Sequence, residues 1–370
     1  MSGTSLDGVD GVLADFTGGR LRVVCHAAAP FPRELKAELL ALNTAGDNEL
    51  HRAALAANAL VRLYAAVVGG LLRTANLPAA RVKAIGAHGQ TVRHRPQEFD
   101  ADPRQGIAGG YTLQLNNPAL LAELTGIDVV AEFRTRDVAA GGQGAPLVPA
   151  FHREVFGTPG EPLAVLNIGG ISNLSVLPGA AADAVLGFDC GPGNALMDHW
   201  CQQHTGQPFD RGGAWAAQGQ VLPALLAGLM AEPFLQKAPP KSTGRDLFNP
   251  AWLAVALAAS PTAAPVDVQA TLTEFTARAC ADAVARHAAG SRTLVVCGGG
   301  ALNTQLMARL QAALPNAAVR SSAQHGLPPL EVEAAAFAWL ARQTLLRRPG
   351  NLASVTGARG ERVLGAVFPA

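Results

Sequence analysis

Apolar residues along the chain follow two patterns, one with a helical repeat and one of short continuous runs. Within residues 32–76, apolar residues recur every three or four positions from Leu50 to Val68, which predicts a mostly helical segment with one buried face. Residues 268–289 show a comparable amphipathic repeat. The run at 293–297 is short, apolar and followed by three glycines, which is typical of a buried strand. The alternation of the two patterns predicts an α/β protein.

The same reasoning assigns the remaining elements. We predict strands at 9–13, 21–26, 82–85, 112–115 and 128–131, two strands joined by a glycine turn within 163–177, and strands at 185–189 and 293–297. We predict helices at 118–124, from about 194, and at 268–289, 303–313 and 331–347. Residues 134–149 carry charge and glycine together, and we expect a functional loop at a domain junction there. We expect residues 207–244 to be loop-rich.

Glycine-rich turns occur at matching places in the two halves of the chain. Each half has a glycine and serine or threonine turn with its hairpin, then a helix, then an apolar strand that ends in a glycine cluster. These turns lie at 2–8 and 86–91 in the first half and at 169–175 and 298–300 in the second. The repeated order predicts a duplicated α/β unit with a nucleotide-sized cleft between the copies.

Length and composition support two globular domains. A chain of 370 residues is long for one core, so two domains with a cleft are expected. Hydrophobic residues make up 49% and charged residues 15%, which excludes a disordered chain. The formal net charge of +1 gives no electrostatic reason to expect nucleic acid or an anionic membrane as a partner. An anionic ligand must therefore be bound by local groups.

Cysteine usage and the apolar runs bear on location. The five cysteines are scattered and form no Cys-x-x-Cys pair, so we expect neither a disulfide framework nor a zinc site. No apolar run approaches the roughly 18 residues that a spanning helix needs, and the N-terminus lacks the order of a signal peptide. We expect a soluble, cytoplasmic protein.

Two of the turns have the residues of a phosphate cradle. Glycine lets the backbone approach a ligand closely, and backbone N–H and hydroxyl groups can donate to phosphate oxygens. The candidates are Gly3, Thr4, Ser5 and Gly8 in one turn and Gly169, Gly170 and Ser172 in the other. Asp7 or Asp10 could hold Mg²⁺ through water. No P-loop or dinucleotide fingerprint is present, and ordinary hairpin turns remain the alternative.

Asp189 stands where an apolar run meets a Gly-Pro-Gly corner, and Asn194 then begins a helix-like segment. Such a corner places a carboxylate beside free backbone donors at a helix N-terminus, an arrangement suited to anion chemistry. The alternative is a local turn in which Asp189 only bonds nearby backbone.

Other polar residues leave two interpretations open. His88, Gln90 and Thr91 follow a buried strand and could bind a hydroxylated ligand, or His88 could be a structural histidine.

The charged residues elsewhere are equally open. Arg134, Arg136 and Asp137 could bind ligand, although pairing at the surface is the simpler expectation. Glu333 precedes an apolar run and could be a first-turn helix acid or a cleft carboxylate.

Five segments together carry a family resemblance. They read Met-Ser-Gly-Thr-Ser-Leu-Asp-Gly-Val-Asp at 1–10, Gly-Ala-His-Gly-Gln-Thr at 86–91, Gly-Gly-Gln-Gly-Ala-Pro-Leu-Val-Pro at 141–149, Asn-Ile-Gly-Gly-Ile-Ser-Asn-Leu at 167–174 and Gly-Phe-Asp-Cys-Gly-Pro-Gly-Asn at 187–194. From about residue 2 to 340 the chain closely resembles the bacterial anhydro-N-acetylmuramic acid kinases. The resemblance implies a duplicated actin-like (ribonuclease H-like) ATPase fold of two α/β domains with a central cleft. We expect one domain at 1–132, joined by about 345–370, and the other at 133–344.

The resemblance also implies an activity and its residues. The family uses ATP and Mg²⁺ to convert 1,6-anhydro-N-acetylmuramic acid to N-acetylmuramic acid 6-phosphate in peptidoglycan recycling, and it makes a homodimer reasonable. Asp189 would be the catalytic base, and Asp7 the residue that holds Mg²⁺ through water. Nucleotide-binding positions would be Gly3, Thr4, Ser5, Leu6, Asp7, Gly8, Val9, Asp10, Asn167, Gly169, Gly170, Ser172, Asn173, Gly298, Gly299 and Gly300. Substrate-binding positions would be His88, Gln90, Thr91 and Glu333.

The chain departs from the family pattern at three places. The family normally has a strand leading into the first turn, and this chain begins at Met1 of that turn, so we expect the first sheet to lack a central strand. Cys190 replaces the usual threonine and loses a hydroxyl donor. Asn116 and Asn117 replace a more usual Gly-Asp or Gly-Asn pair. The alternatives to the anhydro-sugar kinase are a kinase for another sugar or amino sugar, and a non-catalytic nucleotide-binding protein.

Overall fold

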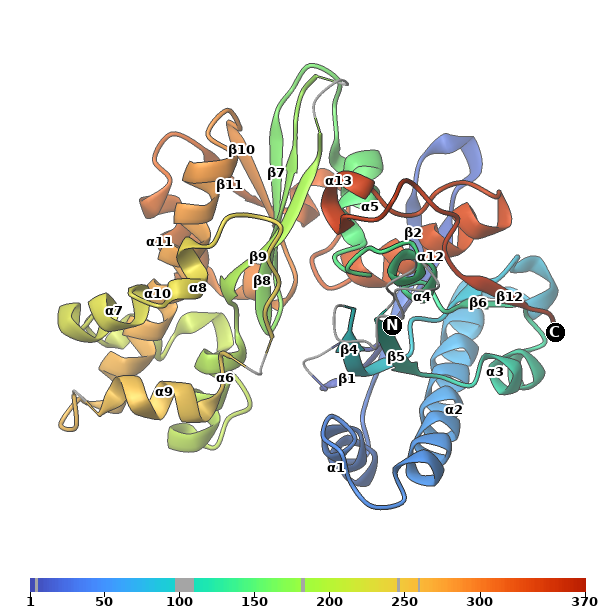
Figure 1. The fold of residues 1–370 in the computed structure, drawn as a ribbon, viewed down its shortest axis with the longest axis horizontal. Helices are drawn as coiled ribbons and strands as arrows, with labels where there is room; N and C mark the ends of the chain where they lie inside the picture. Colours follow the sequence, from blue (N-terminus) through green and yellow to red (C-terminus); the bar gives the residue numbers. More distant parts are fainter. Residues whose placement is uncertain (4–5, 97–109, 181–183, 245–246, 259) are drawn as a thin grey trace, which may run out of the picture. The chain divides into compact units, whose positions relative to one another are not determined.

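Strands and helices alternate along most of the chain, as the apolar pattern predicts. The structure is a computed structural model that describes residues 1–3, 6–96, 110–180, 184–244, 247–258 and 260–370 (Figure 1). These residues form two units. The first unit comprises Met1–Val155 with Glu331–Ala370, and the second comprises Phe156–Leu330.

A five-stranded sheet forms the centre of the second unit. Its strands are β7 (Leu163–Ile168), β8 (Ile171–Leu177), β9 (Leu186–Pro192), β10 (Thr293–Cys297) and β11 (Ala318–Ser321). The order is β11-β10-β7-β8-β9, with β7, β10 and β11 parallel and β8 antiparallel to both of its neighbours. This order is the ribonuclease H-like arrangement that the resemblance implies. The two strands predicted within 163–177 and the strand predicted at 293–297 are confirmed.

Helix α10 (Pro265–His287) forms most of the buried layer beside that sheet. Phe275 and Leu272 of α10 pack in one core with Leu166 of β7 and Phe188 of β9. The other helical elements of this unit are α6 (Ala195–Thr205), η4 (Arg211–Gly213), η5 (Ala216–Gln218), α7 (Pro223–Met230), α8 (Pro233–Gln236), α9 (Pro250–Leu257), η6 (Gly299–Leu302), α11 (Thr304–Ala313) and η7 (Ser322–His325).

The expectation that 207–244 is loop-rich did not include the helices that the structure has there. Helices α7 and α8 lie within it, and each has a proline in its first turn, where the missing N–H has no helical partner in any case. Both helices are shorter than the window in which a helical repeat can be recognised. Their prolines therefore suggested a loop, whereas in the structure each proline marks the start of a helix.

The strands described in the first unit form three small sheets. Strands β1 (Gly8–Asp15) and β2 (Arg22–Pro30) pair as a hairpin, and β4 (Gln90–Arg95) pairs with β5 (Tyr111–Leu115). The third sheet has the order β12-β6-β3, in which β12 (Ala366–Phe368) is antiparallel and β3 (Ile85–Gly86) parallel to β6 (Val129–Ala131). In Figure 1 the red β12 of the C-terminal segment lies beside β6.

Strands β1 and β3 belong to different sheets in the described part of the chain, although both contact α12 (Val332–Leu345). Beside β1, Met1 and Asp10 exchange backbone hydrogen bonds of 2.8 and 2.9 Å, as an antiparallel pair does.

Helices of the first unit pack around these sheets. They are α1 (Arg33–Ala41), α2 (Glu49–Ala75), α3 (Pro118–Thr125), α4 (Thr135–Ala139), α5 (Val148–Phe156), α12 and α13 (Ala353–Thr356), with short 3-10 turns η1 (Thr17–Gly19) and η2 (Ala79–Arg81). By length and hydropathy alone α2 could cross a membrane, contrary to the expectation that no apolar run is long enough. One face of α2, including Leu60, Val61 and Leu71, packs in the core of this unit, which accounts for its apolar composition.

Asp137 ties the segment after residue 132 to the C-terminal segment. Its carboxylate is fully buried and accepts hydrogen bonds from Asn351 Nδ2 (2.6 Å), Thr356 Oγ1 (2.8 Å) and the N–H of Gly144 (2.7 Å). The expectation of surface pairing was therefore wrong for Asp137, and 134–149 includes α4 rather than loop alone. The domain boundaries at 132 and 345 stay predictions, while the units of the structure divide after Val155 and before Glu331.

Candidate active site

Two predicted turns of the second unit lie against each other. The N–H of Asn194 donates to the carbonyl of Gly169 (2.7 Å), and the N–H of Gly193 donates to the carbonyl of Gly170 (3.0 Å). A Cβ atom on Gly193 would lie 2.2 Å from the oxygen of Gly169, so only glycine permits this approach. The Gly-Pro-Gly corner after Asp189 is thereby fixed onto the turn between β7 and β8.

The third turn, Gly298 to Gly300, packs on the same strand end. Because β7 and β10 are parallel neighbours, Cys297 pairs with Asn167 and the next residues leave the sheet together. Gly298 has φ +77°, and a Cβ there would lie 2.4 Å from Asn167 Oδ1. A Cβ on Gly300 would lie 2.4 Å from Ile168 Cγ2. Contacts within the protein thus exclude side chains at these glycines, and the turns pack closely against each other.

Several predicted residues near these turns serve the protein itself. Ser172 is fully buried, and its hydroxyl donates to the carbonyl of Pro192 (3.1 Å). Asn167 is 4% exposed, and Asn173 pairs with Asp189 across β8 and β9. Gly299 lies near Asn194, since a Cβ there would be 3.4 Å from Asn194 Nδ2. The nucleotide roles of these positions stay predictions.

Asp189 lies at an irregularity of β9. Ser172 pairs with Gly191 and Asn173 with Asp189, so Cys190 is the extra residue of a β-bulge. Bulges re-aim neighbouring side chains and are common next to active sites.

The Asp189 carboxylate is held by a segment from a distant part of the chain. Asp189 Oδ2 accepts hydrogen bonds from the Ser242 hydroxyl (2.8 Å) and from the N–H of Thr243 (3.0 Å). Sequence reasoning missed both residues, although the donor-rich Lys-Ser-Thr-Gly after Pro239 and Pro240 was the available signal.

Cys190 points into the core. Its thiol is 1% exposed and donates to the carbonyl of Ser172 (3.4 Å). The hydrogen-bonded Cys280 thiol and burial hold the pKa of Cys190 well above its usual range, so the thiol stays neutral. The replacement of threonine by cysteine therefore changes a buried donor and does not remove a donor from Asp189.

In the first unit, the turn before β1 is built by close backbone contacts. The N–H of Leu6 donates to the carbonyl of Gly3 (3.3 Å), and Leu6 has φ +55°. A Cβ on Gly8 would lie 2.3 Å from the oxygen of Ala29, and Val9 is buried beside it. Thr4 and Ser5 lie outside the described residues.

His88 links this turn to Arg134. Its Nδ1 lies 3.2 Å from the carbonyl oxygen of Ser2, and Arg134 Nε donates to its Nε2 (3.0 Å). A carbonyl can only accept and a guanidinium can only donate, so we assign the ring proton to Nδ1. Burial and the positive charges of Arg134 and the N-terminus hold the pKa of His88 well below its usual range. His88 is a neutral ring that orients Arg134, whose Nη1 also donates to the carbonyl of Gly144 (2.8 Å).

Gln90 also supports the turn. It is 1% exposed, and its Nε2 donates to the carbonyl of Gly3 (3.1 Å). Within the described residues its Oε1 has no hydrogen-bond partner. Thr91 Oγ1 accepts from Gln114 Nε2 (3.2 Å). The roles of His88, Gln90 and Thr91 in substrate binding stay predictions.

The acidic candidates of the first unit surround the same turn. Asp10 Oδ1 lies 3.1 Å from His26 Nε2, and Asp7 is exposed. Glu333 lies in the first turn of α12, and its charge acts with that of Asp10 on the Met1 ammonium, whose pKa burial lowers to about 6. No cluster of three or more His, Cys, Asp or Glu side chains occurs among the described residues. A magnesium ion that keeps most of its water shell needs only one or two carboxylates, which an exposed Asp7 fits.

Comparison with known proteins identifies the family. The family model described as anhydro-N-acetylmuramic acid kinase matches residues 1–370. The chain belongs to this family. The anhydro-N-acetylmuramic acid kinase of Variovorax paradoxus (strain S110) is 71% identical over 373 residues, covering 100% of this chain and 98% of the relative. That of Albidiferax ferrireducens is 63% identical over 388 residues, with the same coverage.

Solved structures give a weaker likeness. The activator of 2-hydroxyisocaproyl-CoA dehydratase from Clostridium difficile has a TM-score of 0.43 and 12% identity, covering 85% of this chain and 84% of its own. We draw no argument from a likeness of that size.

Proposed function

We propose that this chain is an ATP-dependent kinase that converts 1,6-anhydro-N-acetylmuramic acid to N-acetylmuramic acid 6-phosphate in peptidoglycan recycling and amino-sugar metabolism. The observation that carries the proposal is Asp189, oriented at a bulge beside close-packed glycine turns, in a chain that matches this family along its whole length. The overall reaction consumes ATP, the anhydro sugar and one water and yields ADP and the 6-phosphate.

Asp189 is the general base of this proposal. It accepts a proton from the water that attacks C1 of the sugar, as the base of an inverting glycosidase does. The C1–O6 bond breaks, and O6 forms a bond to the γ-phosphorus as the bond from that phosphorus to ADP breaks. Because phosphorus captures O6, a separate acid to protonate the leaving oxygen is not needed.

The glycine turns supply backbone donors for the phosphates. Residues 3–10 and 167–173 are assigned to the phosphate groups and Gly298 to Gly300 to the adenosine side. Their N–H groups stabilise charge that develops on the transferring group. Mg²⁺, held through water by Asp7, supplies further charge neutralisation when bound. We assign His88, Gln90, Thr91 and Glu333 to the sugar, and His88 also accepts a hydrogen bond from Arg134.

Mass spectrometry of the reaction product tests the proposal. The purified chain is incubated with the anhydro sugar, ATP and Mg²⁺, and the expected product gains both a phosphoryl group and a water. A product with phosphate and no water would instead identify an ordinary sugar kinase. Assays with N-acetylmuramic acid and plain hexoses would then identify its substrate. Absence of product with ATP still bound would favour a non-catalytic nucleotide-binding protein.

Replacement of the base gives a sharper test. We expect Asp189→Asn to abolish turnover and to leave ATP affinity nearly unchanged, because an amide cannot take the proton from water. Asp282→Asn, an exposed acid on α10, is the matched control and should keep full turnover. Loss of turnover and ATP binding together in Asp189→Asn would show a structural role.

Location and assembly complete the proposal. We place the enzyme in the cytoplasm, where ATP is available, and expect a homodimer. Light scattering on the purified chain measures the assembly, and a monomeric mass at micromolar concentration would remove that part of the proposal.

A further inference from the structure

The open edge of β9 is covered at Asp189 by residues 241–243. Strand β9 is the last strand of its sheet, so its outer backbone groups have no strand partner within the described sheet. There the N–H of Asp189 donates to the carbonyl of Lys241 (3.2 Å), and two donors from Ser242 and Thr243 reach Asp189 Oδ2. The backbone and the side chain of Asp189 are therefore both bound by one short segment.

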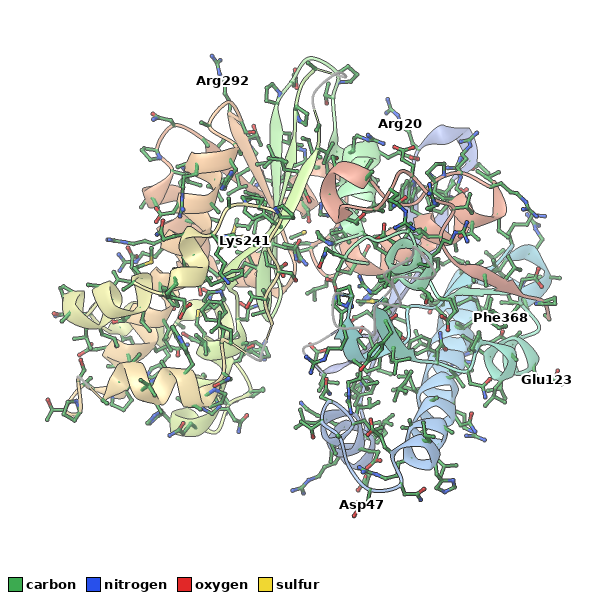
Figure 2. All side chains as sticks on the ribbon, in the orientation of Figure 1. Arg20, Asp47, Glu123, Lys241, Arg292 and Phe368 are labelled. Carbon is green, nitrogen blue, oxygen red and sulfur yellow. The ribbon has the colours of Figure 1, made fainter. Side chains whose placement is uncertain are left out.

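Lys241 fixes this segment to the protein. Its Nζ donates to the carbonyls of Phe234 (3.2 Å) and Leu235 (3.1 Å) in α8, as a lysine near a helix C-terminus can. The ammonium also lies 4.8 Å from the centre of the Phe234 ring. Figure 2 labels Lys241, which lies beside the sheet of the second unit.

We propose that Ser242 and Thr243 are positioning residues that hold the carboxylate of Asp189 in the orientation needed to activate water, and that Lys241 anchors them. This inference rests on the proposed role of Asp189 and adds residues that the family match does not assign. Neither residue touches the reacting atoms in this account, because each acts through Oδ2 of Asp189.

The two donors can be separated by mutation. Ser242 donates through its side chain, so Ser242→Ala removes the hydrogen bond and Ser242→Thr retains it. Thr243 donates through its backbone, so Thr243→Val keeps the donor and removes only the hydroxyl. Asp282→Asn, at an exposed acid of α10 outside this segment, is the control.

Steady-state kinetics give the first readout. We expect Ser242→Ala to lower kcat roughly 10- to 100-fold, the range of one hydrogen bond to a charged group, with KM for ATP changed less than twofold. Ser242→Thr restores most of kcat, Asp282→Asn stays within twofold of the wild type, and Lys241→Met lowers kcat in the same direction as Ser242→Ala. A Ser242→Ala enzyme within twofold of the wild type, or one that loses ATP affinity and folding along with kcat, would overturn the proposal.

The titration of Asp189 gives a second readout that does not need turnover. Loss of a donor destabilises the charged carboxylate, so ¹³C NMR of labelled aspartate should show the Asp189 pKa higher in Ser242→Ala and close to that of the wild type in Ser242→Thr. Lys241 and Cys190 are titratable neighbours that interact electrostatically with Asp189, and both variants leave them in place. An unchanged Asp189 titration in Ser242→Ala would refute the contact.

The two proposals fail in different ways. If the wild type forms no phosphorylated product, the proposed function fails, and the NMR titration still decides whether Ser242 and Thr243 hold Asp189. If the wild type is active and Asp189→Asn is not, an active Ser242→Ala enzyme refutes only the positioning role.

Discussion

Asp137→Asn is expected to loosen the connection between α4 and the C-terminal segment. Three donors converge on the buried Asp137 carboxylate, two on Oδ1 and one on Oδ2. An asparagine of the same shape replaces one acceptor oxygen by an NH₂ group. If the NH₂ group takes the Oδ2 position, one hydrogen bond is lost, the one from the N–H of Gly144. If it takes the Oδ1 position, two are lost, so we expect the first orientation.

The magnitude follows from that geometry. A hydrogen bond to a charged group contributes about 1.5 to 3 kcal/mol, and a buried donor left unpaired costs about 1 to 3 kcal/mol more. We therefore expect a local destabilisation of about 3 kcal/mol, which corresponds to a roughly 100-fold change in an opening equilibrium.

Hydrogen–deuterium exchange detects this opening directly. Peptides that contain residues 141–144 and 356–362 should exchange roughly 100-fold faster in Asp137→Asn, because exchange from a locally opened state follows the free energy of opening. Asp47→Asn, on an exposed loop labelled in Figure 2, is the control and should leave exchange in these peptides unchanged. Protection within threefold of the wild type in Asp137→Asn would refute the reasoning.

Two further predictions concern stability. In urea unfolding, Gly298→Ala should destabilise the protein by roughly 2 kcal/mol more than Gly326→Ala. Both glycines have positive φ, but only a Cβ at Gly298 would lie within 3 Å of other atoms. Equal losses of unfolding free energy in the two variants would contradict this prediction. Burial lowers the pKa of His152 to about 3, whereas the pKa in the unfolded chain is 6.5. Below pH 6.5 the unfolded chain binds a proton that the folded protein does not, so the free energy of unfolding falls as the pH falls from 6.5 towards 3. In His152→Leu the free energy of unfolding should fall less steeply with decreasing pH, by about 1.4 kcal/mol per pH unit below 6.5. Urea unfolding at several pH values measures this dependence, and the same dependence in the wild type and the variant would refute the prediction.

Elements whose residues contact each other locally could be predicted from sequence. The strand at 293–297 matches β10, and the predicted helix at 303–313 matches α11 within one residue, because period and glycine or asparagine boundaries lie within the segment itself. The glycine turns were recognised because a missing side chain is visible in the sequence. Their packing on one strand end follows from the parallel pairing of β7 and β10.

Short elements and long-range polar contacts could not be predicted in this way. Helices α7 and α8 begin at prolines that indicated loop, and their apolar residues reveal a face only when packed in the core of the second unit. Sequence reasoning placed Asp137 at the surface because a lone acid next to arginines is usually exposed.

The sequence by itself determined the alternation of helices and strands, the glycine turns, the candidate base Asp189 and the family resemblance. Only the tertiary structure decided what holds the critical carboxylates. Asp189 meets Ser242 across 53 positions of sequence, and Asp137 meets Thr356 across 219. Such pairs leave no local periodic signal, since their geometry is set by the packing of whole elements and not by the preferences of neighbouring residues.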